Sequence, residues 1–150
     1  MSKGLNFTTT THDTVPERLL QGFEVLKVFN LTGTCIRSLP LSLFQLGDLR
    51  TLILRNCFSL EELPPLGGLS KFQMLNLCAT RIKELPSGME KLSNLRQLDL
   101  SHTDSLKTIH IVHKCTIATV TVACAFNILI IFSLSSPFLL NSLFLFPLCT

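Results

Sequence analysis

The segment LPSGMEKLSNLRQLDLS, at residues 85–101, contains the pattern that decides the fold. Four of its leucines follow the spacing L-x-x-L-x-x-L-x-L, which is typical of a turn leading into a short strand: Leu92, Leu95, Leu98 and Leu100. The apolar residue that opens this strand, Leu95, has counterparts at a constant 23-residue interval: Phe72, Leu49 and Leu26. Equal intervals of this length predict a solenoid of stacked repeats.

The repeats are of the leucine-rich type, and they predict an α/β leucine-rich-repeat solenoid of about four 23-residue units over residues 15–109. Side chains alternate between the two faces of a strand, so in the first repeat Phe29 and Leu31 would point into the core while Val28 and Asn30 point outward. We expect the parallel strands to line a concave face and each repeat to return along a convex face.

The returning segments follow Pro40, Pro64 and Pro86, and we expect a loose helical turn in each. Gly67-Gly68 weakens this helix in the second repeat, because glycine is a poor helix former. The turn after each strand carries a small, weakly polar residue at Thr34, Cys57, Thr80 and Thr103. We expect these side chains to satisfy buried amides of the turn.

The N-terminal segment at residues 1–14 is polar, rich in threonine and without periodicity, which predicts disorder. Val15-Pro16, followed by Leu19 and Leu20, resembles the back half of a repeat whose front half is absent. The solenoid would then begin without the polar cap that usually covers its first core edge.

The C-terminal tail at residues 110–150 departs from the repeat, and all of the Lys, Arg, Asp and Glu side chains lie at or before Lys114. One interpretation is a transmembrane helix over residues 115–134, because twenty uncharged and mostly apolar residues can cross a bilayer core of about 30 Å. Lys107 and Lys114 would then keep the repeats cytosolic, as in a tail-anchored membrane protein.

A second interpretation is that the tail is read-through from an exon into an intron. In the segment 133–150, every residue except Asn141, Cys149 and Thr150 is Phe, Leu, Ser or Pro, whose codons are mostly pyrimidine-rich. The repeat also loses its phase abruptly after Ile109. A third interpretation is an ordinary apolar segment that packs on the open end of the solenoid.

Composition and motifs argue against several functional classes. A net charge of +3 without a basic stripe gives nucleic-acid binding no support. The six cysteines form no C-x-x-C pair and have no metal-ligand spacing with the four histidines, so we expect reduced thiols, no metal and no cofactor. The N-terminus has no secretory signal, which favours a cytoplasmic protein. No nucleophile motif or phosphate-binding loop is present, and we expect no enzymatic activity.

The closing Leu-Pro pairs, the Thr or Cys of each turn and above all the segment at residues 85–101 resemble the repeat region of plant disease-resistance receptors. These are nucleotide-binding, leucine-rich-repeat proteins, and the similarity is greatest to their coiled-coil class. It covers about residues 15–109. The resemblance implies that the repeats recognise a pathogen-derived or guarded host protein, whereas the nucleotide-binding module of the family has no counterpart in this sequence.

The candidate site is the outward face of the four strands, because repeat proteins bind their partners there. With four strands this surface is small for tight binding. Twelve residues are predicted to form it: Val28, Asn30, Thr32, Thr51, Ile53, Arg55, Met74, Asn76, Cys78, Gln97, Asp99 and Ser101.

The sequence therefore favours a protein–protein interaction module with a part in plant defence. Two alternatives are also compatible with the sequence. One is a membrane-anchored leucine-rich-repeat adaptor or decoy whose tail, at residues 115–134, holds it at the bilayer. The other is a stand-alone intracellular scaffold of the Ras-group type, although that group usually keeps Asn where this chain has Thr34, Cys57, Thr80 and Thr103.

Overall fold

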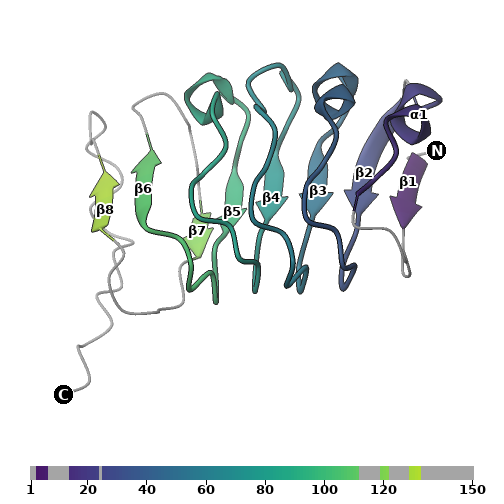
Figure 1. Ribbon diagram of the computed structural model, residues 1–150. Coiled ribbons are helices and arrows are strands. Elements are labelled where there is room, and N and C mark those ends of the chain that lie inside the picture. Colours follow the sequence, from purple (N-terminus) through teal and green to yellow (C-terminus); the bar gives the residue numbers. More distant parts are fainter. Residues whose placement is uncertain (1–2, 7–13, 24, 112–118, 122–128, 133–150) are drawn as a thin grey trace.

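The computed structural model describes residues 3–6, 14–23, 25–111, 119–121 and 129–132. These residues contain one parallel six-stranded sheet, in the order β1-β2-β3-β4-β5-β7, and a two-stranded pair of β6 with β8 (Figure 1). The strands are β1 (Lys3–Asn6), β2 (Leu26–Asn30), β3 (Thr51–Ile53), β4 (Met74–Asn76), β5 (Gln97–Asp99), β6 (Thr108–Ile111), β7 (Thr119–Thr121) and β8 (Leu129–Phe132). The predicted solenoid is confirmed.

The register of the central strands follows the 23-residue interval of the sequence. Val28 lies beside Thr51, Thr51 beside Met74, and Met74 beside Gln97. Backbone hydrogen bonds continue this register past the strands. For example, the Leu31 amide donates to the Ile53 carbonyl oxygen at 2.9 Å. Each repeat therefore occupies the same position relative to the next.

The returning segments differ between repeats as the sequence predicts. The first contains a 3-10 helix, η1 (Leu41–Gln45), and the third contains another, η2 (Met89–Lys91). The second repeat, with its Gly67-Gly68 pair, has turns in place of a helix. One α-helix, α1 (Glu17–Gln21), precedes β2, with Pro16 before its first turn.

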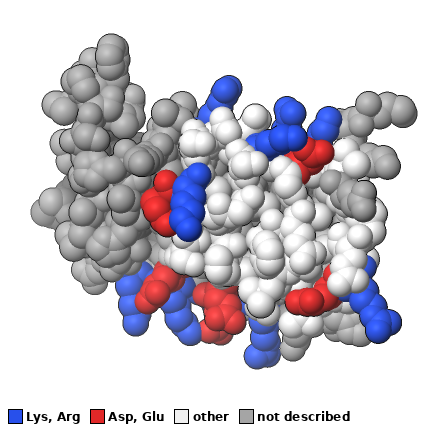
Figure 2. All heavy atoms as spheres, turned by 90° about the horizontal axis from the view of Figure 1, so that it is seen from above, with Lys and Arg blue, Asp and Glu red and all other residues white. Residues whose placement is uncertain are grey.

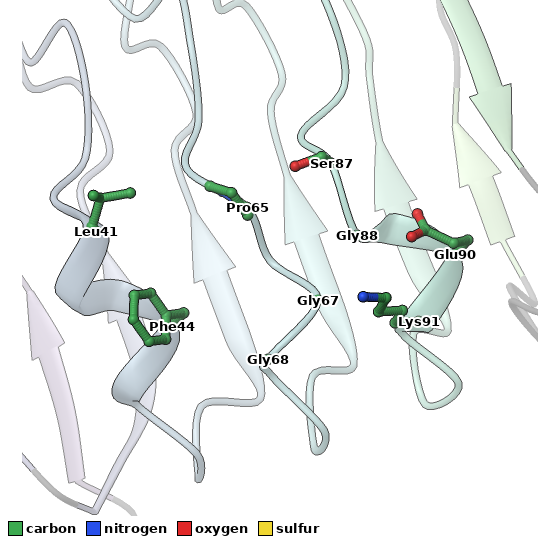
Figure 3. Close-up of a pocket in the computed structure, with 9 residues that line it drawn as sticks. All are labelled: Leu41, Phe44, Pro65, Gly67, Gly68, Ser87, Gly88, Glu90 and Lys91. Carbon is green, nitrogen blue, oxygen red and sulfur yellow. The ribbon is translucent and has the colours of Figure 1, made fainter.

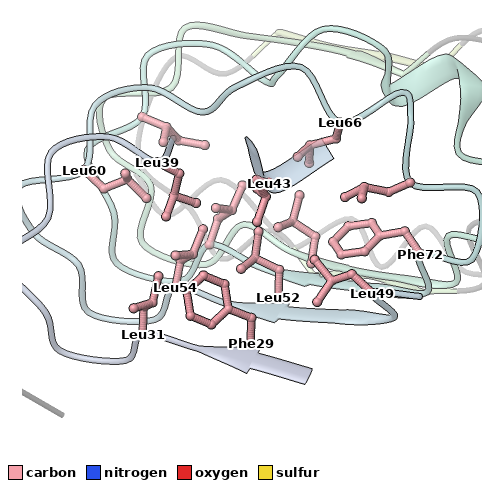
Figure 4. Packing of buried hydrophobic residues seen from close by; sticks show 14 of the residues in the cluster. Phe29, Leu31, Leu39, Leu43, Leu49, Leu52, Leu54, Leu60, Leu66 and Phe72 are labelled. Carbon is pink, nitrogen blue, oxygen red and sulfur yellow. The ribbon is translucent and has the colours of Figure 1, made fainter. Parts of the chain in front are cut away.

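A single hydrophobic core lies between the strands and the returning segments, and Figure 4 shows the side chains of successive repeats stacked along it. The predicted inward residues are fully buried in all four repeats: Phe29, Leu31, Leu52, Leu54, Leu75, Leu77, Leu98 and Leu100. Because no single repeat can bury its own apolar face, stacking supplies the stability of the fold.

The N-terminal segment provides a correction. The sequence predicts disorder throughout residues 1–14, but Lys3–Asn6 forms β1, which pairs in parallel with β2. Leu5 lies beside Phe29 and Asn6 beside Asn30, so the offset is one residue longer than between the later strands. The front half of the first repeat is therefore present, and the expectation of its absence is wrong. Residues 7–13 of the expected disordered segment lie outside the described residues.

The tail provides a second correction. The predicted transmembrane helix over residues 115–134 is not supported, since the described parts of this range are the strands β7 and β8. β7 pairs in parallel with β5 and adds a strand to the main sheet, with Thr119 beside Gln97. Within the described residues, no helix has the length and apolar character needed to span a bilayer. The rest of the predicted helix lies outside them.

Candidate functional site: the strand face

The outward side chains of β2, β3, β4 and β5, with those just beyond the strand ends, make up the strand face. The structure places the twelve predicted residues in three rows that cross the strands. The first row is Val28, Thr51, Met74 and Gln97, and the second is Asn30, Ile53, Asn76 and Asp99. The third row lies just beyond the C-terminal ends of the strands: Thr32, Arg55, Cys78 and Ser101.

The rows differ in how much surface they offer to a partner. Gln97 and Arg55 are exposed, whereas Cys78 and Ser101 are buried, each at 9% exposure. The remaining eight predicted residues are half-buried. The strand face is therefore most accessible at β5 and at the end of β3.

Several polar side chains of the second row are already engaged in the fold. Asn30 Oδ1 accepts hydrogen bonds from the Thr32 amide at 3.0 Å and from the Thr32 hydroxyl at 2.6 Å. Asn76 Oδ1 accepts from the Cys78 amide at 3.0 Å, and its Nδ2 donates to Asp99 Oδ2 at 3.0 Å. These side chains shape the turns after β2 and β4, so part of the polar surface is already held in place before a partner binds.

A further row, not predicted from the sequence, lies at the start of the strands. Lys27, Arg50, Gln73 and Arg96 recur at the same 23-residue interval. The Arg50 amide donates to the Lys27 carbonyl oxygen at 2.9 Å, and the Arg96 amide donates to that of Gln73 at the same distance. Arg50 and Arg96 are exposed, and Lys27 is half-buried. The regular spacing of three basic residues was the signal that could have revealed this row.

The turn residues have a structural role that differs from the expected one. The hydroxyls of Thr34, Thr80 and Thr103 each donate to the carbonyl oxygen three residues earlier, at 2.7–2.8 Å. The expectation was that they would serve buried amides, but here they are donors. Some turn amides bond to the next repeat, as when Gly33 donates to the Arg55 carbonyl oxygen at 2.9 Å, and others bond within their own repeat, as when Thr34 donates to the Leu31 carbonyl oxygen at 3.2 Å.

Two exposed ion pairs connect neighbouring repeats. Lys71 Nζ lies 2.5 Å from Asp48 Oδ1, and Lys83 Nζ lies 2.5 Å from Glu61 Oε2. The hydrogen bond from Lys71 lowers the pKa of Asp48, and the bond from Lys83 lowers the pKa of Glu61. The same pairing raises the pKa of Lys83. Glu61 and Lys83 also line a polar groove of about 700 Å³ beside the Leu-Pro pairs.

A separate groove of about 410 Å³ lies among the returning segments of the first three repeats. Figure 3 shows Leu41 and Phe44 of η1 on one side of it and Glu90 and Lys91 on the other, with the backbone of Gly67 and Gly68 between them. This groove was not predicted from the sequence, because it depends on the spatial fit of three returning segments.

Comparison with solved structures identifies the fold. The structure of the Leptospira interrogans leucine-rich-repeat protein LIC12759 matches with a TM-score of 0.60 and 26% identity, over 69% of this chain and 29% of that chain. The fold is a leucine-rich-repeat solenoid. No protein-family model matches the chain.

Comparison with curated proteins supports the predicted resemblance to plant resistance proteins. Over 60 residues the chain is 48% identical to the disease resistance protein At4g27190 of Arabidopsis thaliana, covering 39% of this chain. Over 57 residues it is 47% identical to the probable disease resistance protein At4g27220 of the same plant, covering 38% of this chain. The chain spans 6% of the length of each relative. It is thus similar to a short segment of much larger proteins that are named for disease resistance.

Proposed function

We propose that the strand face recognises a protein partner, and that the partner is a pathogen-derived protein or a host protein that a resistance receptor guards. The observation that carries the proposal is the alignment of the outward side chains. Two rows of outward side chains cross the strands at a constant 23-residue interval, with one further row at each end of the strands, so successive repeats present equivalent positions side by side. Leucine-rich-repeat proteins bind partners over such extended surfaces.

The relatives supply the biological setting of the proposal. Both curated matches carry disease resistance in their names. The first match extends over 60 residues, and repeat solenoids such as this chain act through extended binding surfaces. We therefore propose a non-enzymatic role in the cytoplasm, where pathogen effectors that enter the cell would be met. Fractionation of plant cells expressing the tagged full chain tests the location, and recovery in the membrane fraction would contradict it.

The test of partner binding uses the full chain as bait in a display selection from plant and pathogen protein libraries. Each selected binder is then titrated against a strand-face variant, Thr51→Arg/Gln97→Arg. We expect at least about tenfold weaker binding for this variant, because two bulky cations on outward positions of the same row disrupt the contact.

The matched control is Gln21→Arg/Gln45→Arg, which adds the same two charges at exposed positions outside the strands. We expect its affinity to stay within about twofold of the unmodified chain. An equal loss of affinity in the two variants, or selected binders whose affinity neither variant changes, would show that the strand face is not the binding surface.

A further inference from the structure

The groove between η1 and η2 has an exposed apolar wall. Leu41 is 58% exposed and Phe44 is 45% exposed, and both project from the 3-10 helix of the first repeat. Apolar side chains that are grouped on a solvated surface mark a candidate contact site, whereas scattered single ones are ordinary. Here the hollow is formed by Pro65, Gly67 and Gly68 of the second repeat.

The hollow exists because the second repeat has small residues where its neighbours have helices. A Cβ on Gly67 would lie 3.1 Å from the Gly88 Cα, and a Cβ on Gly68 would lie 3.4 Å from the Phe44 carbonyl oxygen. The returning segments are therefore packed with almost no room for side chains at these positions. Their backbone forms the floor of the groove, next to the projecting Phe44 ring (Figure 3).

The opposite wall carries one acid and one base. Glu90 and Lys91 are both exposed, and within the described part of the chain neither forms an ion pair. Figure 2 views the molecule from above relative to Figure 1 and shows charged side chains mainly along two opposite sides, with a largely uncharged band between them.

We propose that this groove binds a second copy of the chain in a two-fold symmetric dimer. Such a contact requires one patch to be complementary to itself. The groove meets this requirement twice. Phe44 of each copy fits the glycine-lined hollow of the other, and the Lys91 ammonium of each copy pairs with the Glu90 carboxylate of the other. This contact is independent of the strand face and of the function proposed for it.

The dimer is expected to be weak, because its contact depends on a few side chains, whereas stable complexes bury roughly 1200 Å² or more. Sedimentation velocity of the full chain between roughly 5 and 500 µM covers the expected range of dissociation constants. We expect a concentration-dependent shift from monomer to dimer. Phe44→Glu and Leu41→Glu should each weaken the dimer at least about tenfold. Circular dichroism confirms that each variant is folded.

Phe58→Glu is the matched control, since Phe58 is 61% exposed in the turn after β3 and does not line the groove. It should leave the dimer within about twofold of the unmodified chain. A charge exchange tests the pairing. Lys91→Glu alone should weaken the dimer, and Glu90→Lys/Lys91→Glu should restore it, because the exchanged pair is again complementary to itself.

Three results would overturn the proposal. One is a chain that stays monomeric over the whole concentration range. Another is a dimer that Phe44→Glu and Phe58→Glu weaken equally, which would place the contact elsewhere. The third is an exchanged double variant that stays as weak as Lys91→Glu alone, because Glu90 would then have no part in the contact.

Discussion

Thr34 and Cys57 occupy the same position in successive repeats, and both donate to the carbonyl oxygen of Leu31. The Thr34 hydroxyl does so at 2.8 Å within its own repeat, and the Cys57 thiol reaches back from the next repeat at 3.1 Å. The two side chains lie 3.4 Å apart. Burial raises the pKa of the Cys57 thiol, so the protonated donor form persists at neutral pH.

Replacement of Cys57 tests this inter-repeat contact. Cys57→Ala removes the thiol from a fully buried site and should cost about 1–2 kcal/mol of the free energy of unfolding. Cys57→Thr should stay within about 1 kcal/mol of the unmodified chain, because Thr at the equivalent positions donates to the carbonyl three residues earlier. Urea unfolding followed by circular dichroism measures both. A Thr variant less stable than the Ala variant would contradict the argument.

A second prediction concerns the residues that directly precede Thr34, Cys57, Thr80 and Thr103. In all four repeats this preceding residue has a left-handed backbone conformation. The φ values are 72° at Gly33, 60° at Asn56, 56° at Ala79 and 58° at His102. A Cβ is disfavoured in this region by about 1–2 kcal/mol. Ala79→Gly should therefore raise the free energy of unfolding by up to about 1 kcal/mol, and Gly33→Ala should lower it by about 1 kcal/mol.

Gly47→Ala is the control for this pair of variants. Neither Gly33 nor Gly47 has a heavy atom within 4 Å of an added Cβ, but Gly47 is not among the residues with positive φ. The two substitutions thus differ in backbone conformation and not in packing. Gly47→Ala should be neutral or stabilising by up to about 1 kcal/mol in the same unfolding experiment. Equal destabilisation by Gly33→Ala and Gly47→Ala would show that backbone strain is not the cause.

The repeat interval predicted the register of β2 to β5 and the inward residues, because a 23-residue period leaves one way to align the strands. β1 was missed for two reasons. Its offset from β2 is one residue longer than the repeat interval, and Leu5 is its one large apolar side chain. β7 was missed because residues 115–134 are almost uniformly apolar, and a run without alternation does not distinguish a strand from a helix.

The candidate site was predictable in outline and not in detail. Strand alternation predicted the outward positions within the strands, since they depend on sequence alone once the register is fixed, but beyond the strand ends Cys78 and Ser101 are buried. It could not show that Asn30 and Asn76 bond to the turns that follow them, because that depends on backbone geometry. The groove beside Phe44 depends on the spatial fit of three returning segments, which no local pattern encodes.

Gly88 offers a third prediction, which separates steric overlap from backbone strain. Its φ is 86°, as unfavourable for a side chain as that of Gly33, but an added Cβ would also lie 2.6 Å from the Gly67 nitrogen. Gly88→Ala should therefore cost at least about 2 kcal/mol, more than Gly33→Ala, because the second and third repeats must move apart. The comparison is made by thermal unfolding of the two variants. A smaller loss for Gly88→Ala would mean that the two backbones are not in close contact.

The last prediction concerns the pH dependence of the Glu61–Lys83 ion pair. Because Lys83 lowers the pKa of Glu61 in the folded chain, the unfolded chain binds more protons at acidic pH. The stabilisation from this pair is fully present above the ordinary Glu pKa of 4.5 and is lost as the pH falls through the lower folded value. Glu61→Gln should be less stable than the unmodified chain at pH 7, and the difference should shrink as the pH falls below about 4.

The measurement is the urea midpoint of both proteins from pH 7 down to pH 3, with Glu62→Gln as the control. Glu62 is exposed like its neighbour, but it forms no ion pair within the described residues, so its replacement removes a charge and leaves the pair intact. Because the pair is exposed, added salt should also reduce the difference at pH 7. A difference between Glu61→Gln and the unmodified chain that stays constant with pH would show that the carboxylate of Glu61 does not contribute to stability through Lys83.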